Sequence, residues 1–280
     1  MLILHSIEEC IRWRISNDGS VGFVPTMGAL HEGHLSLVKI SKKNCESTIV
    51  SIFVNPAQFS LDEDFDSYPR TTKHDLKYLK RENVDAVFLP LADELYKETK
   101  NEYFYDTPLS YKLEGKSRPH FFKGVTMVVN KLFNVVNPTH AIFGQKDAQQ
   151  LIIIKQMIHN KSCPIEILEG PTIRDNNGLA LSSRNDYLSN DNKKIASNIY
   201  KGLIIIKKSL EQGVNSSRDL KQKFKNYLKK FPGLKIDYIS IACANSLDEI
   251  ETVDKKSLIS TAVFFKDVRL IDNFTYFPST

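Results

Sequence analysis

Two histidines near the N-terminus, His31 and His34, stand three residues apart with Gly33 between them. They follow the apolar run 21–24 and open a segment with helical periodicity. A helix that starts directly after a strand presents backbone N–H groups and the positive end of its dipole, and both favour an anion. Imidazole N–H groups can donate to phosphate oxygens at the same place. A chance pair of surface histidines is the alternative, but the strand–turn–helix context favours a phosphate site.

The elements that must position this turn alternate along the first two-thirds of the chain. Apolar, β-branched runs predict buried parallel strands, and 3.6-residue periodicity predicts helices. This order predicts an α/β fold with a Rossmann-like, doubly wound parallel sheet, whose ligands bind beyond the carboxyl ends of the strands. The predicted strands are 21–24, 48–54, 86–89, 140–143 and 165–168, and the predicted helices are 34–43, 72–82, 125–136 and 148–159.

The pattern changes after Gly170 and Pro171. A turn-rich segment at 174–178 is followed by further predicted elements, so we expect a second, smaller α+β domain at the C-terminus. The predicted division is 1–175 and 176–280. The elements predicted for the second domain are helices 192–212 and 217–230 and strands 237–243 and 260–271.

The composition, charge and cysteine content exclude several classes of protein and of binding site. With 280 residues, 41% hydrophobic and 25% charged, the chain is typical of a globular protein. The net charge of +5 favours anionic ligands, but no stripe that combines aromatic residues with arginines accompanies lysine-rich stretches such as 221–225, so they are expected to be solvated helix faces and not a nucleic-acid surface. Four cysteines without a Cys-x-x-Cys pair argue against a zinc site or a disulfide scaffold. The first residues resemble no basic leader and no apolar run reaches membrane-spanning length, so we expect a cytoplasmic protein without membrane contact.

Five strings carry a resemblance to one family. Residues 25–34, Pro-Thr-Met-Gly-Ala-Leu-His-Glu-Gly-His, resemble the nucleotide site of the HIGH-motif nucleotidyltransferase superfamily, and in particular the pantothenate synthetase (pantoate–beta-alanine ligase) family. The likeness continues in the family's order at 53–59, 68–70, 143–150 and 178–185, and the C-terminal part is similar only in general character.

The resemblance implies an ATP-dependent ligase that works in two steps. The carboxylate of pantoate attacks the α-phosphorus of ATP to give pantoyl adenylate and pyrophosphate, and the amine of beta-alanine then displaces AMP to give pantothenate. A carboxylate is ionised at pH 7, so the first step needs positioning and charge neutralisation rather than a general base. The resemblance also implies a homodimer, a first domain that binds ATP and pantoate, and a C-terminal lid domain that closes over ATP.

Four residues are expected to be catalytic: His31, His34, Lys146 and Arg184. Lys146 stands at a helix start, where a cation is unfavourable unless it has a partner such as a phosphate. Arg184 would offer a forked guanidinium to the β- and γ-phosphates together with two serine hydroxyls, although this sequence alone is more often a cap. The implied ATP-binding residues are Met27, Gly28, Ala29, Leu30, His31, Glu32, Gly33, His34, Gly144, Gln145, Lys146, Asp147, Ile173, Leu181, Ser182, Ser183 and Arg184.

The implied ligands of pantoate and beta-alanine are Gln58, Gln150 and Met27. Amides both donate and accept, which suits a ligand with one carboxylate and two hydroxyls. Met27 and Phe59 are expected to pack against the gem-dimethyl group of pantoate. Without the resemblance, each glutamine would be interpreted as an ordinary surface residue.

Mg²⁺ is expected with ATP, held mostly by phosphates and water and by one carboxylate, for which Asp75 and Asp147 are the candidates. The acidic segment 62–66 lacks the ligand spacing and glycine of an EF-hand and is expected to be a solvated loop. The family usually has Arg-Pro-Gly-His-Phe where this chain has 118–122, Arg-Pro-His-Phe-Phe. Phe121 therefore occupies the position of the family's histidine, and the role of that histidine is open in this chain.

Two other functions stay open. A nucleotidyltransferase that moves AMP or CMP onto a phosphate acceptor would share His31 and His34, but it would not explain the paired glutamines. A nucleotide-binding sensor without catalysis would leave His34 and Lys146 without a purpose.

Overall fold

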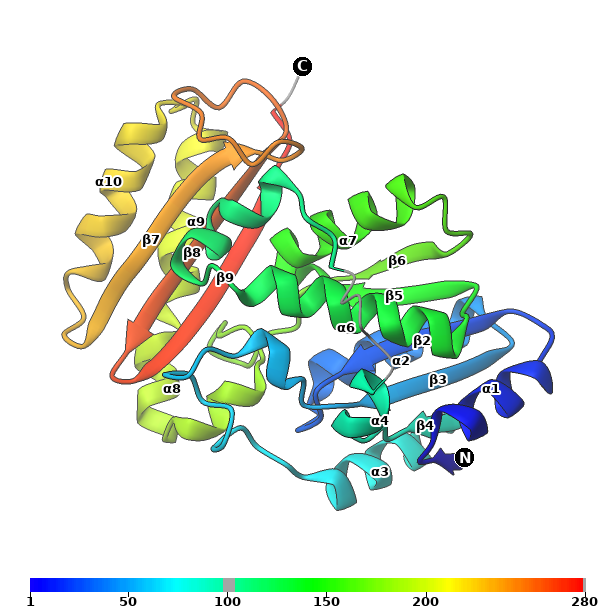
Figure 1. Ribbon diagram of the computed structural model, residues 1–280. Coiled ribbons are helices and arrows are strands. Elements are labelled where there is room, and N and C mark those ends of the chain that lie inside the picture. The colour runs from blue at the N-terminus through cyan, green and yellow to red at the C-terminus, as the bar shows by residue number, and fades with distance from the viewer. Residues whose placement is uncertain (98–103, 279–280) are drawn as a thin grey trace. The chain divides into compact units, whose positions relative to one another are not determined.

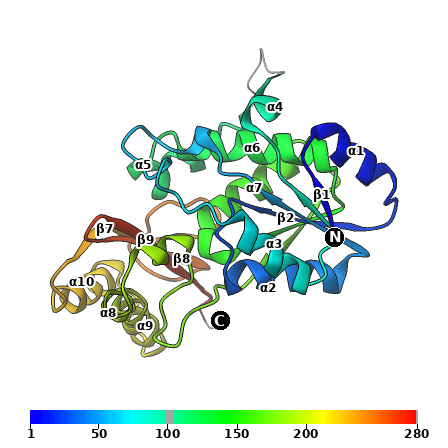
Figure 2. The same ribbon diagram turned by 90° about the horizontal axis from the view of Figure 1, so that it is seen from below.

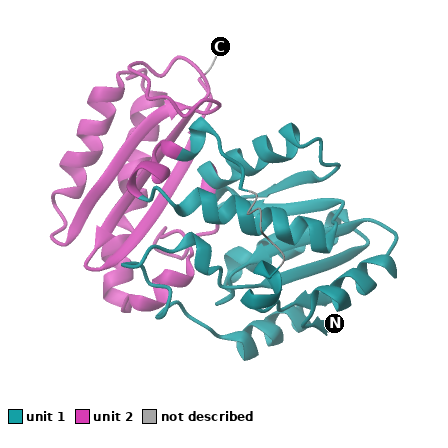
Figure 3. Cartoon of the chain, viewed as in Figure 1, with its two compact units in different colours: residues 1–110, 118–145, 149–172 teal, residues 111–117, 146–148, 173–280 magenta. Residues whose placement is uncertain are grey.

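The computed structural model describes residues 1–97 and 104–278. The chain forms two compact units, each assembled from segments that are distant in sequence (Figure 3). The first unit holds 1–110, 118–145 and 149–172, and the second holds 111–117, 146–148 and 173–280. Within the described ranges no helix combines the length and the apolar character needed to cross a membrane. Whether the units act as the predicted substrate-binding and lid domains stays a prediction.

A six-stranded, wholly parallel sheet forms the centre of the first unit, with strand order β1-β4-β3-β2-β5-β6 (Figure 1). The order reverses at β2, which pairs with β3 on one side and with β5 on the other. Such a switch point is where doubly wound sheets bind their ligands. The Rossmann-like prediction is confirmed. The strands are β1 (Leu2–Leu4), β2 (Val21–Thr26), β3 (Ser47–Ile52), β4 (Ala86–Phe88), β5 (His140–Gly144) and β6 (Glu166–Gly170).

Helices cover both faces of this sheet, as Figure 2 shows. The side chains of β2 alternate between the two cores: Phe23 packs with the helices of one face and Val24 with those of the other. Because both faces are covered, the inner strands are buried along almost their whole length, as β2 and β4 show, whereas the edge strand β6 keeps two glutamates. One face carries α2 (Glu32–Asn44) and α3 (Thr72–Arg81), and the other carries α1 (Ile7–Ile15), α6 (Phe121–Val136) and α7 (Ala148–Asn160).

The second unit is a three-stranded antiparallel sheet, in the order β7-β8-β9, with helices packed on it. Apolar side chains from the sheet and the helices share one buried core. The smaller α+β part predicted for the C-terminus is therefore confirmed. Its elements are α8 (Asn190–Ala196), α9 (Asn198–Glu211), α10 (Ser217–Leu228), β7 (Leu234–Cys243), β8 (Ser257–Phe265) and β9 (Val268–Tyr276).

A short segment from the middle of the chain, 111–117, belongs to the second unit because charged groups attach it to the sheet. Arg269 on β9 makes a two-point ion pair with the buried carboxylate of Glu114 and also bonds Asp237 at 2.7 Å. Lys112 reaches Asp248 at 2.6 Å. A buried arginine–carboxylate pair is costly to break, because each partner would leave an uncompensated charge.

Two predictions for the second domain were wrong. The single strand predicted at 260–271 is a hairpin, β8 and β9, joined at Lys266, which has φ of 53°. The sequence offers no Asn-Gly or Asp-Gly pair there, so the usual hairpin signal is missing. The single helix predicted at 192–212 is divided into α8 and α9 at Ser197. The side chains of Ser197 and Asn198 donate hydrogen bonds to carbonyl groups of the preceding turn.

The first strand, β1, and the first helix, α1, were not among the predicted elements. The helix α1 begins with a capping box in which Ser6 accepts from the N–H of Glu9 and the carboxylate of Glu9 accepts from the N–H of Ser6. A serine followed three residues later by a glutamate is a recognisable start signal, and it could have found this helix.

Helix α6 passes very close to the turn η1 (Pro56–Gln58) because Gly124 has no side chain. A Cβ at this position would lie 2.1 Å from the carbonyl oxygen of Ala57 and 2.6 Å from the backbone nitrogen of Gln58. Backbone atoms cannot move aside as a flexible side chain can. The glycine therefore sets the distance between α6 and the turn that carries Gln58.

We expect Gly124→Ala to destabilise the protein, because the overpacking cost of about 1–3 kcal/mol exceeds the gain of about 0.5–1 kcal/mol from helix propensity. Thermal unfolding measures the difference. Gly144→Ala is the matched control, since a Cβ there would meet its nearest neighbour only at 4.0 Å. Equal midpoints for the two variants would contradict the close approach.

Candidate functional site

The histidine turn lies directly after β2, at the switch point of the sheet. His31 is the N-cap of α2, and His34 is the third residue of the helix. The Nδ1 atom of His31 accepts from the backbone N–H of Gly33 at 3.1 Å, and the Nδ1 atom of His34 accepts from that of His31 at 3.4 Å. The two rings lie with their centroids 4.1 Å apart. The predicted pair is thus brought together by a capping box made of histidines.

These caps determine which ring nitrogen carries the proton. A neutral imidazole has one N–H, and an Nδ1 atom that accepts a hydrogen bond cannot hold it. Both His31 and His34 are therefore Nε2–H donors when neutral. In this tautomer each imidazole has an Nε2–H group, which can donate a hydrogen bond to an anion.

A buried carboxylate holds the turn in front of the histidines. Asp75, on α3, is 1% exposed and accepts the N–H groups of Ala29 and Leu30 at 3.0 and 2.9 Å, together with the hydroxyl of Thr71 at 3.1 Å. The sequence analysis placed Ala29 and Leu30 among the ATP-binding residues and expected backbone N–H groups to meet the anion. In the structure these two N–H groups donate to Asp75 instead.

The backbone of the same turn is left-handed at two consecutive residues. Gly28 has φ of 83° and Ala29 has φ of 49°. A Cβ on Gly28 would lie 2.9 Å from the side chain of Ile52, so glycine is required both by its dihedral angle and by space. Glu32 follows in the first turn of α2, where its exposed carboxylate lies 4.0 Å from Lys39.

The strand beside β2 in the switch point, β5, ends at Gly144 and leads into a 3-10 turn, η3 (Gln145–Asp147). Gln145 belongs to the first unit and donates to Glu169 at 3.0 Å. Lys146 and Asp147 belong to the second unit, and their charged groups lie 3.9 Å apart. The side chain of Lys146 is 19% exposed. An ion pair at this distance is weak, so Lys146 keeps the capacity to bind an anion.

The Ser-Ser-Arg segment begins η4 (Ser183–Tyr187) in the second unit. Ser182 is its N-cap and accepts the N–H of Arg184 at 3.3 Å, and Ser183 is buried. The N–H of Leu181 donates to the carbonyl of Ile173 at 2.9 Å. The structure thus brings together the residues predicted for ATP within 173–184, and it gives Ser182 the capping role that such sequences usually have.

The predicted pantoate ligands Met27 and Gln58 are in contact. The amide nitrogen of Gln58 lies 3.0 Å from the sulfur of Met27, and its oxygen accepts from Asn55 at 3.1 Å. Asn55 is 1% exposed and is itself fixed by the carbonyl of Gly124 at 3.2 Å and by Tyr96. The sequence analysis missed Asn55. An asparagine directly before a proline, at the end of a buried strand, was the signal that could have found it.

The other two residues predicted to contact pantoate, Gln150 and Phe59, do not share the hydrogen bonds that join Met27, Asn55 and Gln58. Gln150 is half-buried in the first turns of α7 and lies outside the hydrogen-bonded cluster of Met27, Asn55 and Gln58. The ring of Phe59 packs against Phe65 and Tyr68, with centroids 5.4 and 5.8 Å apart. The role of Gln150 and Phe59 as pantoate contacts stays a prediction.

Phe121 has a clear structural role in this chain. The guanidinium of Arg118 lies 4.0 Å from the centre of the Phe121 ring. Arg118 also forms a two-point ion pair with Glu63, at 2.6 and 2.5 Å, and donates to the carbonyl of Gln58 at 3.3 Å. The acidic segment 62–66 is therefore not simply a solvated loop, because Glu63 and Arg118 attach it to the turn that carries Gln58.

No group of three or more metal-ligating side chains in residues 1–97 and 104–278 is arranged to hold a metal ion. Of the two magnesium candidates, Asp75 already accepts three hydrogen bonds. Asp147 is 45% exposed at its side chain and stands next to Lys146. Asp147 is thus the carboxylate that fits a metal held mainly by ATP and water.

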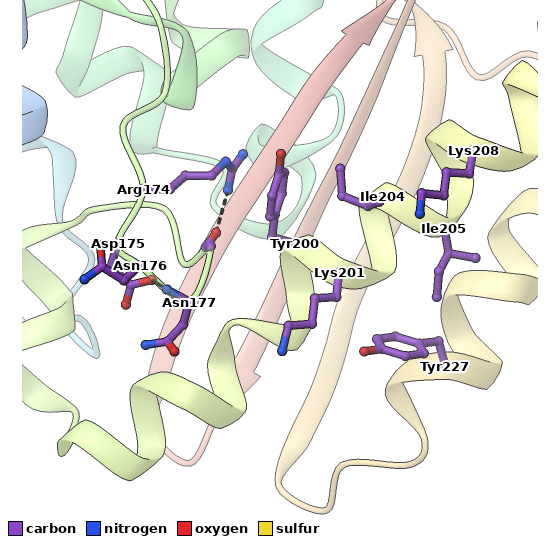
Figure 4. A pocket seen from close by; sticks show the side chains of 11 residues that line it. Arg174, Asp175, Asn176, Asn177, Tyr200, Lys201, Ile204, Ile205, Lys208 and Tyr227 are labelled. Atoms are coloured by element: carbon purple, nitrogen blue, oxygen red, sulfur yellow. Dashed lines mark hydrogen bonds between the residues drawn. The ribbon is translucent and has the colours of Figure 1, made fainter.

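A pocket of about 600 Å³ lies elsewhere in the second unit, between the turn 174–178 and helix α9 (Figure 4). Its lining includes Arg174, Tyr200 and Lys208 and contains none of the residues predicted for ATP or pantoate. We do not assign it to the predicted reaction.

Comparison with known proteins gives a consistent result. A family model described as pantoate–beta-alanine ligase matches residues 2–275. A pantothenate synthetase from Thermosipho africanus is 45% identical over 276 residues, which cover 98% of this chain and 99% of the relative.

Solved structures agree. The crystal structure of pantothenate synthetase from Thermus thermophilus has a TM-score of 0.93 at 36% identity and covers 98% of this chain and 99% of its own. The ligase from Francisella tularensis, described as complexed with beta-gamma ATP and beta-alanine, has a TM-score of 0.81 at 34% identity over 100% of both chains. The chain belongs to the pantoate–beta-alanine ligase family.

Proposed function

We propose that the protein condenses pantoate with beta-alanine through a pantoyl adenylate and releases pyrophosphate and AMP. One observation supports this most directly: Gln58 contacts Met27, in the same turn that presents His31 and His34. A group suited to an organic acid thus lies beside groups suited to phosphates. That arrangement serves a reaction in which a carboxylate attacks a phosphorus atom.

As a member of its family, the protein is an ATP-dependent ligase. The Francisella relative is described with a form of ATP and with beta-alanine, and we propose that this chain uses ATP and beta-alanine as well. We also propose a cytoplasmic location, predicted from the composition and the N-terminal residues, and a homodimer, which the family resemblance implies.

In the first proposed step, a carboxylate oxygen of pantoate forms a bond to the α-phosphorus, and the bond from that phosphorus to the bridging oxygen of pyrophosphate breaks. The acid is already ionised, so no base is required. The Nε2–H groups of His31 and His34 donate to phosphate oxygens, and Lys146 and Arg184 neutralise the charge of the leaving pyrophosphate. Removing one such preorganised donor typically costs about 3–4 kcal/mol of barrier.

In the second proposed step, the neutral amine of beta-alanine attacks the carbonyl carbon of the mixed anhydride. The C–N bond forms, the bond to the AMP oxygen breaks, and the amine loses one proton to the solvent. Met27 and Gln58 hold the acyl part in place during both steps. Exclusion of water by the occupied site protects the anhydride until the amine arrives.

Mg²⁺, when bound with ATP, would neutralise phosphate charge, with Asp147 as the protein carboxylate nearest to Lys146. The proposed roles of the chain's own residues do not depend on it.

The proposed function is tested by isotope exchange. With pantoate, ATP and Mg²⁺ but without beta-alanine, labelled pyrophosphate should enter ATP, because the first step is reversible on its own. A nucleotidyltransferase would need a phosphorylated acceptor instead, and a sensor would show no exchange. If the folded protein binds ATP and pantoate supports no exchange, the proposed function is wrong.

We expect Gln58→Ala and Gln150→Ala to weaken pantoate binding far more than ATP binding. Each leaves a polar group of the bound acid without its partner, at a cost of about 1–3 kcal/mol. Calorimetric titration with ATP and with pantoate separates the two effects. Gln212→Ala, on the exposed end of α9, is the control. Losses of equal size for both ligands would count against the assigned roles.

Asp75→Asn should reduce kcat/KM by about 100-fold, the effect expected when a catalytic group moves by about 1 Å. The amide offers only one acceptor oxygen to the N–H groups of Ala29 and Leu30, so the turn before His31 loses an anchor. Asp62→Asn, an exposed carboxylate changed in the same way, is the control. Wild-type kinetics for Asp75→Asn would show that the turn does not need this carboxylate.

A further inference from the structure

The turn that carries Lys146 is attached to the sheet of the second unit by a side chain that no part of the proposed reaction uses. The amide nitrogen of Asn273, on β9, donates to the main-chain carbonyl of Lys146 at 2.7 Å. The turn η3 is only three residues long, and Lys146 is its central residue. The hydrogen bond to this carbonyl therefore fixes the position of the Lys146 backbone.

Asn273 is in turn held by its neighbour. Asp272 is 4% exposed, and its Oδ1 atom accepts the backbone N–H of Asn273 at 2.8 Å. The same carboxylate forms a two-point ion pair with Arg174, at 2.6 and 2.8 Å. Paired donors of this kind fix direction as well as distance.

Arg174 connects this pair to the turn 174–178. Its guanidinium lies 3.5 Å from the centre of the Tyr200 ring and donates to the carbonyl of Gly178 at 3.2 Å. Figure 4 shows Arg174 and Tyr200 side by side. The stacking and the ion pair together satisfy a largely buried arginine, which would otherwise be costly. The backbone next to Arg174 pairs with the segment before Ser182, through the bond from Leu181 to Ile173.

One hydrogen-bonded framework inside the second unit thus runs from Lys146 to the segment that begins at Ser182. Lysine has a flexible four-carbon side chain, so the place that its ammonium can reach is set by where its backbone is held. An error of about 1 Å in such a group costs about 100-fold in rate. The framework gives both proposed phosphate-binding segments a common support.

We propose that Asn273 is a positioning residue for Lys146. It acts through the lysine and not through contact with ATP, and the proposal rests on the proposed role of Lys146 in binding phosphates. Asn273→Ala and Asn273→Asp both remove the donor, and the aspartate does so with the shape nearly unchanged. Each variant should weaken ATP binding by about 5- to 10-fold, the equivalent of one hydrogen bond, and should leave the affinity for pantoate unchanged.

The test is calorimetric titration of the full chain with ATP and with pantoate, together with thermal unfolding. Thr275→Ala, two residues along β9 and exposed, is the matched control and should bind ATP like the wild type. Wild-type ATP affinity in both Asn273 variants would overturn the proposal. So would equal losses for ATP and pantoate, which would indicate a general effect on the fold.

A double-mutant cycle with Lys146→Ala separates positioning from direct contact. If Asn273 acts through Lys146, adding Asn273→Ala to Lys146→Ala should weaken ATP binding no further. A full additional loss in the double variant would overturn the proposal. If Lys146→Ala alone binds ATP like the wild type, the phosphate role of Lys146 is wrong, and the proposal for Asn273 is overturned with it. A different outcome would overturn the Asn273 proposal alone: Lys146→Ala binds ATP much more weakly than the wild type, and Asn273→Ala binds ATP like the wild type.

Discussion

The carboxylate of Asp75 is the constraint on which the first half of the site depends. It is removed from water, so its charge must be met by donors, and two of these are backbone N–H groups of the left-handed turn after β2. With the turn fixed in this way, α2 must begin at His31. The two imidazoles then cap the helix and each other, which sets their tautomers. A buried carboxylate on α3 thus supports the turn that leads into the two histidine caps.

The short turn that carries Gln58 is also held by several contacts. A glycine on α6 lets the helix approach it closely, a buried asparagine bonds the backbone of α6, and Arg118 bonds both Glu63 and the carbonyl of Gln58. Phe121 contributes by lying under Arg118. Where the family resemblance predicts a histidine, Phe121 supports Arg118, which donates to the backbone carbonyl of Gln58, a proposed substrate ligand. Phe121 therefore has a supporting role in this turn, because the guanidinium of Arg118 packs on its ring.

Much of the fold could be predicted from the sequence, and the failures have identifiable causes. Strands buried on both faces gave clear apolar runs, and β2, β3 and β5 were found for that reason. The hairpin at Lys266 was missed because it depends on the left-handed backbone of a lysine. The break at Ser197 was missed because it depends on a side chain that donates to a helical carbonyl. Hydrophobic periodicity reveals neither feature. In the site, residue types and spacing pointed to His31 and His34, whereas Gln58 was predicted only from the family resemblance. Asn55 was missed although an asparagine before a proline was a usable signal. The anchoring roles of Asp75 and Asn273 could not be predicted, because they come from contacts with distant backbone atoms.

The second unit draws on three separate stretches of the chain, and two of these, 111–117 and 146–148, are short. A gene fragment that encoded only residues from 173 onward would lack Glu114, the partner of Arg269, and the backbone that Asn273 holds. Such a fragment would not be an independent module that could be exchanged between proteins by recombination. Duplication or transplantation of this unit would have to carry the interleaved segments with it, which ties the evolutionary history of the second unit to that of the parallel sheet.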